Sequence, residues 1–192
     1  MYLNWARKAS KYGIELARKN DYDVIFSMHE PPSSHICALK IKEKFKDIPW
    51  VTYWSDPWLK DSTREGIGSI RKSIEGSWEK RVVELSDRFI FVTKANRDDY
   101  VKTYNIPIEK TYILTRGYDS NSYGDIKTLG NPEKIDNSKI NFVYAGEIFS
   151  KLRDVNPFIE AVNQIKEKDI ELFHSLNILF FGNIDDKSVE NK

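Results

Sequence analysis

"YDVIFSMHEPPSSHICALKIKEKFKDIPWVTYWSDPW", residues 22–58, decides the fold class because it places two apolar runs on either side of one amphipathic stretch. The runs at 22–27 and 50–54 are short and rich in β-branched and aromatic residues, which predicts buried strands. Two prolines and two serines precede the stretch up to about residue 45, where apolar residues recur at helical spacing. Strand, helix and strand in this order are typical of a βαβ unit with parallel strands.

The same alternation continues along the chain on both sides of this unit. Further helices are expected over residues 5–16, 70–85, 93–104 and 155–165, and further strands over residues 88–93, 111–115, 140–146 and 176–182. Strands separated by helices of this length predict an α/β fold. We expect a Rossmann-like parallel sheet with flanking helices on both of its faces.

The composition changes between residues 120 and 138, where Asn, Ser, Gly, Asp and Pro dominate as in a linker. This predicts a first domain over residues 1–119 and the beginning of a second Rossmann-like domain over residues 139–192. Both are expected to be incomplete. The chain opens on a helix instead of a strand with a glycine-rich loop, and only strand, helix and strand follow the linker.

The overall composition limits the class of protein. Of the 192 residues 40% are hydrophobic, and 30 Lys and Arg balance 29 Asp and Glu, so the chain has no general attraction to nucleic acid. A single cysteine excludes an internal disulfide. No apolar run approaches the about 20 residues that span a bilayer, and the first residues lack the pattern of a signal peptide. A cytoplasmic location is expected.

Several segments together resemble glycosyltransferase family 4, whose members have the two-domain GT-B fold. They are residues 22–58, "EKRVVELSDRFIFVTKANRDDYV" at 79–101, "ILTRGYD" at 113–119 and "FVYAGEIFSKLRDVNPFIEAV" at 142–162. The resemblance runs from about Trp5 to Phe181. It implies a first domain that faces the acceptor and a second that binds the nucleotide-sugar donor.

The resemblance also implies an activity. Such an enzyme is a retaining hexosyltransferase that moves a sugar from a nucleotide-sugar to a hydroxyl group, and bacterial surface polysaccharide synthesis is the expected setting. The acceptor is a glycan or is lipid-linked, which leaves open a peripheral association with the inner face of the membrane. No cofactor and no catalytic metal are expected. Two family features are missing from the chain, the first glycine-rich loop and the paired donor-binding glutamates. Whether the chain is active by itself is therefore open. The missing segments are expected to come from the same gene or from a partner chain.

Candidate acceptor residues follow the first two predicted strands, because ligands of parallel sheets bind outside the carboxyl ends of the strands. His29 and Glu30 follow the first strand, and the resemblance places this loop at the acceptor cleft. Asp56 follows the second strand and is the candidate catalytic base, which Trp54 and Trp58 would desolvate while stacking on sugar. The alternative for His29 and Glu30 is that they are solvated loop residues. The alternative for Asp56 is that an Asp-Pro turn merely ends the strand while the two tryptophans fill the core.

Candidate donor residues lie in two later loops. Arg116 stands where the family usually has Asn, and a surface arginine beside a glycine turn is the alternative. Gly146 and Glu147 follow a predicted strand, where glycine lets a backbone approach a ligand. Lys151 and Arg153 come just before the next helix and are expected to reach the donor diphosphate. The alternative is an ordinary loop with solvated cations.

Other titratable residues are not expected to form sites. Glu75 and Glu79 are expected on the solvated face of their helix. His35 and His174 have no partners at the spacing of metal ligands, and Cys37 reads as a core thiol. Neither a P-loop nor a G-x-G-x-x-G pattern is present.

Two other functions remain open from the sequence. The chain could be a non-catalytic module that binds a glycan or a protein. It could also belong to a nucleotide-sugar epimerase of the same architecture.

Overall fold

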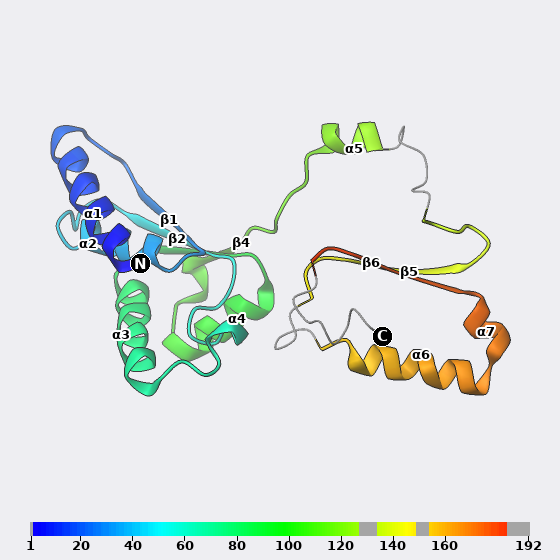
Figure 1. The fold of residues 1–192 in the computed structure, drawn as a ribbon. Coiled ribbons are helices and arrows are strands. Elements are labelled where there is room, and N and C mark those ends of the chain that lie inside the picture. Colours follow the sequence, from blue (N-terminus) through cyan, green and yellow to red (C-terminus); the bar gives the residue numbers. More distant parts are fainter. Residues whose placement is uncertain (1, 127–133, 149–153, 184–192) are drawn as a thin grey trace. The chain divides into compact units, whose positions relative to one another are not determined.

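A computed structural model of the chain describes residues 2–126, 134–148 and 154–183. It contains two compact units, Met1–Gly117 and Tyr118–Lys192 (Figure 1). Each unit has a parallel sheet with flanking helices, so the predicted α/β class is confirmed. The limits predicted for the domains and the linker stay predictions. Residues expected to begin the linker form helix α5 (Ser120–Ile126), at whose start Asp119 accepts hydrogen bonds from the amide of Asn121 and the hydroxyl of Ser122.

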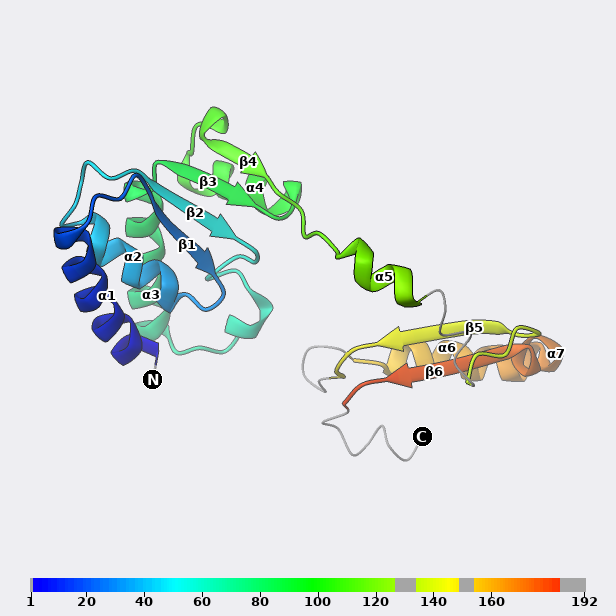
Figure 2. The ribbon, with the colours of Figure 1, turned by 90° about the horizontal axis from the view of Figure 1, so that it is seen from above.

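The first unit is built on a four-stranded parallel sheet in the order β1-β2-β3-β4. Its strands are β1 (Ile25–His29), β2 (Trp50–Trp54), β3 (Arg88–Phe91) and β4 (Thr111–Ile113). The register pairs His29 with Trp54, Trp54 with Phe91, and Phe91 with Ile113. The carboxyl ends of the four strands therefore meet at one edge of the sheet (Figure 2).

Four α-helices accompany this sheet. They are α1 (Tyr2–Lys19), α2 (Ser33–Lys42), α3 (Ser69–Leu85) and α4 (Lys94–Tyr104), with short 3-10 turns η1 (Ser62–Arg64) and η2 (Ile108–Lys110). On α2, His35 bonds Ser27 of β1, and on α4, Tyr100 packs on Trp54 and Phe91. These contacts place α2 and α4 on the same face of the sheet. Within the described residues no helix is long and apolar enough to cross a membrane.

No described helix covers the other face of the sheet, contrary to the expected helices on both faces, and its outer strands are exposed there although Tyr53 of β2 is 9% exposed. Phe26 and Met28 of β1 and Tyr112 of β4 point to this face and are about half exposed, at 53%, 49% and 54%. The strand order explains the difference. When consecutive strands are also neighbours, right-handed crossovers place every connecting helix on the same side.

The core lies between the sheet and the helices and is dominated by aromatic rings. Its largest fully buried side chains include Trp50, Trp54, Trp58, Phe91 and Tyr100. Large flat rings bury much apolar area each, and their offset and tilted contacts stabilise the packing further.

A partly buried ion pair fixes the start of β2, with the side chain of Lys42 8% exposed and that of Asp87 44% exposed. The ammonium of Lys42, near the end of α2, lies 2.8 Å from Oδ2 of Asp87, and the same oxygen accepts the amide of Trp50 at 2.7 Å. Burial raises the pKa of Asp87, but the hydrogen bonds from Lys42 and Trp50 outweigh it and hold the pKa below its usual value. The pair therefore joins a helix end, a strand start and the loop before β3.

Helix α1 packs through small residues instead of large apolar ones. Ala6 and Ser10 are buried at 0% and 3% exposure, whereas Trp5 and Tyr12 are exposed at 54% and 64%. Small side chains allow α1 to lie close to α2, where a Cβ built on Gly13 would meet the side chain of Ile41.

The second unit contains a two-stranded parallel sheet of β5 (Ile140–Ala145) and β6 (Leu176–Phe181), with helices α6 (Asn156–Lys168) and α7 (Ile170–His174). Phe158 of α6 packs on Phe142 and Phe180, one from each strand. After β6, Gly182 has a φ of +144°, and a Cβ there would lie 2.0 Å from the carbonyl oxygen of Gly146. Only glycine fits this position.

Candidate functional site

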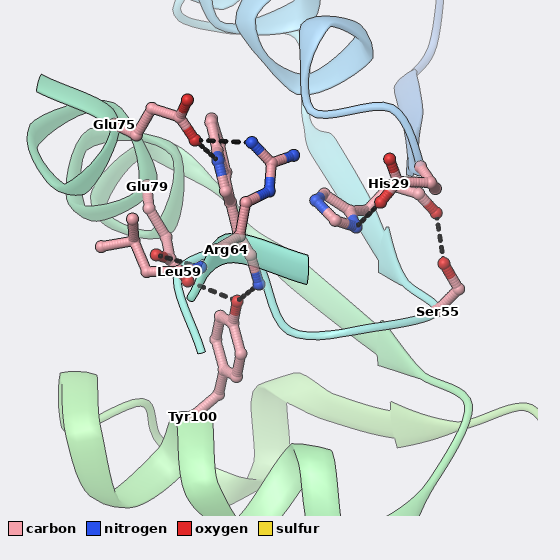
Figure 3. A network of polar contacts seen from close by, with 9 residues as sticks. His29, Ser55, Leu59, Arg64, Glu75, Glu79 and Tyr100 are labelled. Carbon is pink, nitrogen blue, oxygen red and sulfur yellow. Dashed lines mark hydrogen bonds and ion pairs between the residues drawn. The ribbon is translucent and has the colours of Figure 1, made fainter. Parts of the chain in front are cut away.

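The ends of β1 and β2 bring together the predicted acceptor residues of the first unit. His29 ends β1 and Glu30 follows it, while Ser55 and Asp56 follow β2. The hydroxyl of Ser55 donates to the carbonyl oxygen of His29 at 2.6 Å and ties the two strand ends together (Figure 3). We call these four residues the strand-end cluster. Its carboxylate side chains reach solvent, since Glu30 is exposed and Asp56 is half-buried.

The imidazole of His29 is buried and lacks hydrogen bonds among the described residues. It is 3% exposed and stacks on the ring of Trp54, with centroids 5.8 Å apart and planes 17° apart. Its Nδ1 lies 3.7 Å from Oε2 of Glu30. Burial lowers the pKa of His29 to about 4, although the charge of Asp56 works in the opposite direction. The ring is therefore neutral at neutral pH.

Charged groups converge on this edge of the sheet. Burial raises the pKa of Glu30, the cation of Arg64 lowers it, and the carboxylates of Asp61 and Asp56 raise it. The same three groups act on the pKa of His29. The strand ends therefore carry several acids with one arginine, an arrangement that suits the binding of hydroxyl groups and cations.

Trp54 and Trp58 are core residues, as in the alternative interpretation of their sequence. Their exposures are 0% and 1%, so neither ring is open to stack on a sugar in this structure. Their indole nitrogens donate to Oγ1 of Thr52 at 2.9 Å and to Oε2 of Glu75 at 3.0 Å. The chain is thus anchored by a buried ring two residues before Asp56 and by another two residues after it.

Glu75 and Glu79 of α3 are buried, so the prediction that they lie on a solvated face is wrong. Their exposures are 7% and 3%, whereas the large apolar side chains of Ile70 and Ile74 on the same helix are exposed at 79% and 45%. The amino-terminal half of α3 faces the loop that follows β2. Buried donors of that loop need acceptors, which carboxylates provide.

Glu75 is the acceptor for three side chains. Besides the indole of Trp58, it accepts from Nη1 of Arg64 at 3.0 Å and from Nε of Arg71 at 2.7 Å. Burial raises its pKa, but the hydrogen bonds from Arg71 and Trp58 and the charge of Arg64 outweigh this and lower it. Figure 3 shows Arg64 reaching from η1 to this carboxylate.

Glu79 is the acceptor for the loop backbone. It accepts the amide of Leu59 at 3.3 Å and the hydroxyl of Tyr100, whose oxygen in turn accepts the amide of Trp58 at 3.0 Å. Burial raises the pKa of Glu79 more than its hydrogen bonds lower it. We call Glu75 and Glu79 the α3 carboxylate pair. Together they fix the backbone that directly follows Asp56.

Two hollows flank the loop after β2. One of about 720 Å³ lies toward α4, and charged residues such as Lys60 and Asp99 line it together with apolar surface. The second, of about 750 Å³, lies toward α1 and α2, and its lining is mostly apolar. We call it the apolar groove. Arg64 lines both hollows.

The predicted donor residues belong to different units. Arg116 is exposed beyond β4 in the first unit. Gly146 follows β5 in the second unit, where its amide donates to the carbonyl of Phe181 at 2.8 Å, and Glu147 is exposed beside it. Lys151 and Arg153 lie outside the described residues. Their roles stay predictions.

No group of three or more His, Cys, Asp or Glu side chains in the described part of the chain is placed to hold a metal ion.

Parallel sheets with helices define a Rossmann-like α/β protein, and the polar cluster at the carboxyl strand ends is its candidate ligand site. The sequence identifies the family. Residues 2–122 match the family model described as Glycosyltransferase Family 4, so the chain belongs to this family. No curated protein matches the chain significantly.

Solved structures show a similar fold. MnaA of S. aureus, solved with UDP, matches over 100% of this chain and 49% of its own, with 11% sequence identity and a TM-score of 0.55. A glycosyltransferase from Rickettsia africae ESF-5 matches over 94% of this chain and 51% of its own, with 14% identity and a TM-score of 0.50. The chain therefore spans about half the length of these two proteins.

Proposed function

We propose that the protein to which this chain belongs transfers a sugar from a nucleotide-sugar to a hydroxyl group of a glycan or lipid-linked acceptor. The observation that carries the proposal is the position of Asp56, which lies within the residues that match the family and at the carboxyl end of β2. The UDP bound to S. aureus MnaA, a protein of similar fold, supports a nucleoside diphosphate donor. Bacterial surface polysaccharide assembly, at the inner face of the membrane, is the setting that we infer.

Each group of candidate residues has one role in the proposed reaction. The acceptor oxygen forms a bond to the anomeric carbon while the bond from that carbon to the diphosphate breaks. The electron pair leaves with the diphosphate, and Asp56 accepts the hydroxyl proton. Lys151 and Arg153 are assigned to the charge that develops on the leaving group, which basic side chains can stabilise without a metal ion. The anomeric configuration is expected to be retained, which in a single step requires the acceptor oxygen to approach from the same face of the sugar that the diphosphate leaves.

Transfer assays on the intact protein test this proposal. Labelled UDP-glucose, UDP-galactose and UDP-N-acetylglucosamine would be offered with a glycolipid extract as the source of acceptors. We expect Asp56→Asn to lower the rate by about a hundredfold or more, the usual range for loss of a general base. Asp47→Asn is the matched control, because Asp47 is an exposed acid before β2.

Other outcomes would point to other functions. Wild-type turnover in D56N would remove Asp56 from the mechanism. Binding of a nucleotide-sugar without any transfer would favour a non-catalytic module. Conversion of the donor sugar itself, seen in product analysis, would favour an epimerase.

A further inference from the structure

The apolar groove lies between the amino-terminal parts of α1, α2 and α3. Its apolar lining residues are Leu3, Pro32, Ile36, Trp58, Ile70, Ile74 and Trp78. Leu3, Ile70 and Ile74 remain 51%, 79% and 45% exposed, so large apolar side chains stand open to solvent along its rim. A volume of about 750 Å³ is in the range of sites for small organic ligands.

The apolar groove borders the strand-end cluster. Trp58 lines the groove, and its ring lies 5.9 Å from that of His29, measured between centroids. Arg64 also lines the groove and is close enough to act on the pKa values of both His29 and Glu30. A ligand in the groove would therefore end beside the predicted acceptor site.

The charged residues of the groove favour an anion. They are Arg64, Arg71 and Glu75, two cations against one carboxylate. Both cations donate to Glu75, Arg64 from Nη1 and Arg71 from Nε, and their side chains are 16% and 61% exposed. A guanidinium has five N–H donors, so each keeps donors that Glu75 does not use. The groove is also lined by Pro32 and Gly68, the N-cap residues of α2 and α3, and neither helix has a side-chain cap. Their positive ends add to the attraction for an anion.

We propose that the apolar groove binds the hydrocarbon chain of a lipid-linked acceptor and that Arg64 and Arg71 bind the phosphate joining that chain to its sugar. The inference rests on the proposed function and narrows its acceptor to a phosphorylated lipid. Each part of such a molecule has a matching part of the site. The apolar rim would hold the hydrocarbon, the two arginines the phosphate, and the carboxylates of the strand-end cluster the sugar hydroxyl. A free glycan would leave the exposed isoleucines of α3 without a partner.

Calorimetry with farnesyl phosphate as the probe, kept below its micelle concentration, tests the site directly. Farnesol and inorganic phosphate are the two partial probes, and each should bind more weakly than farnesyl phosphate. Ile70→Ser and Ile74→Ser should each weaken binding by about tenfold, because each removes apolar area from the site. Arg71→Gln should weaken the binding of farnesyl phosphate and leave farnesol unchanged.

A matched control is available in the same unit. Ile108 of η2 is exposed at 53% and does not line the groove, so Ile108→Ser should bind like the wild type. The 79% exposure of Ile70 means that its replacement should preserve folding, which circular dichroism would verify. Unchanged affinity in Ile70→Ser and Ile74→Ser would overturn the proposal.

Two further measurements exclude other occupants. Equal binding to phosphatidylglycerol vesicles and to farnesyl phosphate would make the bilayer itself the occupant. A dimer at micromolar concentration that Ile70→Ser dissociates would make a second copy of the chain the occupant. Either result would overturn the proposal.

The transferase proposal and the groove assignment can fail independently of each other. If farnesyl phosphate binds and no sugar transfer is found, the groove assignment stands and the transferase proposal falls. If sugar is transferred to a water-soluble glycan and farnesyl phosphate does not bind, the groove assignment falls alone.

Discussion

Acidification should destabilise the first unit through the buried ring of His29. The imidazole is 3% exposed, and burial lowers its pKa in the folded chain from 6.5 to about 4. As the pH falls below 6.5, the unfolded chain therefore binds a proton that the folded chain does not. The contribution of the neutral His29 to the stability is fully present above pH 6.5 and is lost progressively as the pH falls toward about 4.

The size of this loss follows from the two pKa values. Each pKa unit corresponds to about 1.4 kcal/mol, so the complete effect of His29 is about 3 kcal/mol. Between about pH 7.5 and about pH 4.5 the free energy of unfolding should fall by about 2.5 kcal/mol. His35 acts in the same direction, because burial and the neighbouring His29 lower its pKa. Glu79 acts in the opposite direction, since its folded pKa is raised.

Urea unfolding followed by tryptophan fluorescence can measure this effect. All five tryptophans lie within the first 117 residues, so their emission reports on the first unit alone. His29→Leu keeps a side chain of similar size and removes the titration, so its unfolding free energy should vary less with pH than that of the wild type. His174→Leu changes an exposed histidine of the second unit and is the control. An undiminished pH dependence in H29L would refute the reasoning.

Three substitutions test other parts of the fold. Glu79→Gln places an amide group among the donors of Tyr100 and Leu59 and should cost about 1–3 kcal/mol of stability in the same assay; an unchanged urea midpoint would contradict the carboxylate's role. Gly76→Val should cost about 1–3 kcal/mol by overpacking, because even a Cβ at Gly76 would lie 3.1 Å from Cδ1 of Leu59. If Gly76→Val instead raises the midpoint, that packing is looser than the structure indicates. Gly182→Ala should remove the slow amide exchange of β5 and β6, since φ is +144° and no space exists for a Cβ; retained protection would disprove the requirement for glycine.

The strands and most helices were predictable because they depend on local patterns. Apolar runs such as residues 50–54 alternate with amphipathic stretches, and this fixes parallel strands joined by helices. The faces of helices were less predictable. Periodicity counts large apolar residues, and it therefore missed the small residues through which α1 contacts α2.

The positions of His29, Glu30 and Asp56 at the strand ends were predictable, whereas Ser55 and the α3 carboxylate pair were not. His29 and Asp56 were found because ligands gather at the carboxyl ends of parallel strands. Glu75 and Glu79 have the spacing of ordinary surface acids, and only their partners distinguish them. Those partners, such as Trp58 and Tyr100, are 17 and 21 residues away along the chain, so sequence spacing gives no sign of the contacts.

The anchoring of the loop after β2 has a consequence for its motion. Amides in surface loops usually exchange with solvent through small local openings. The amides of Trp58 and Leu59 are instead bonded to Tyr100 of α4 and Glu79 of α3. They can exchange only when those helices separate from the loop, so their exchange should be as slow as that of the helices. The backbone beside Asp56 thus behaves as part of the core on the time scale of minutes to hours. A substitution on α4 that weakens these bonds would make the backbone beside Asp56 open more often.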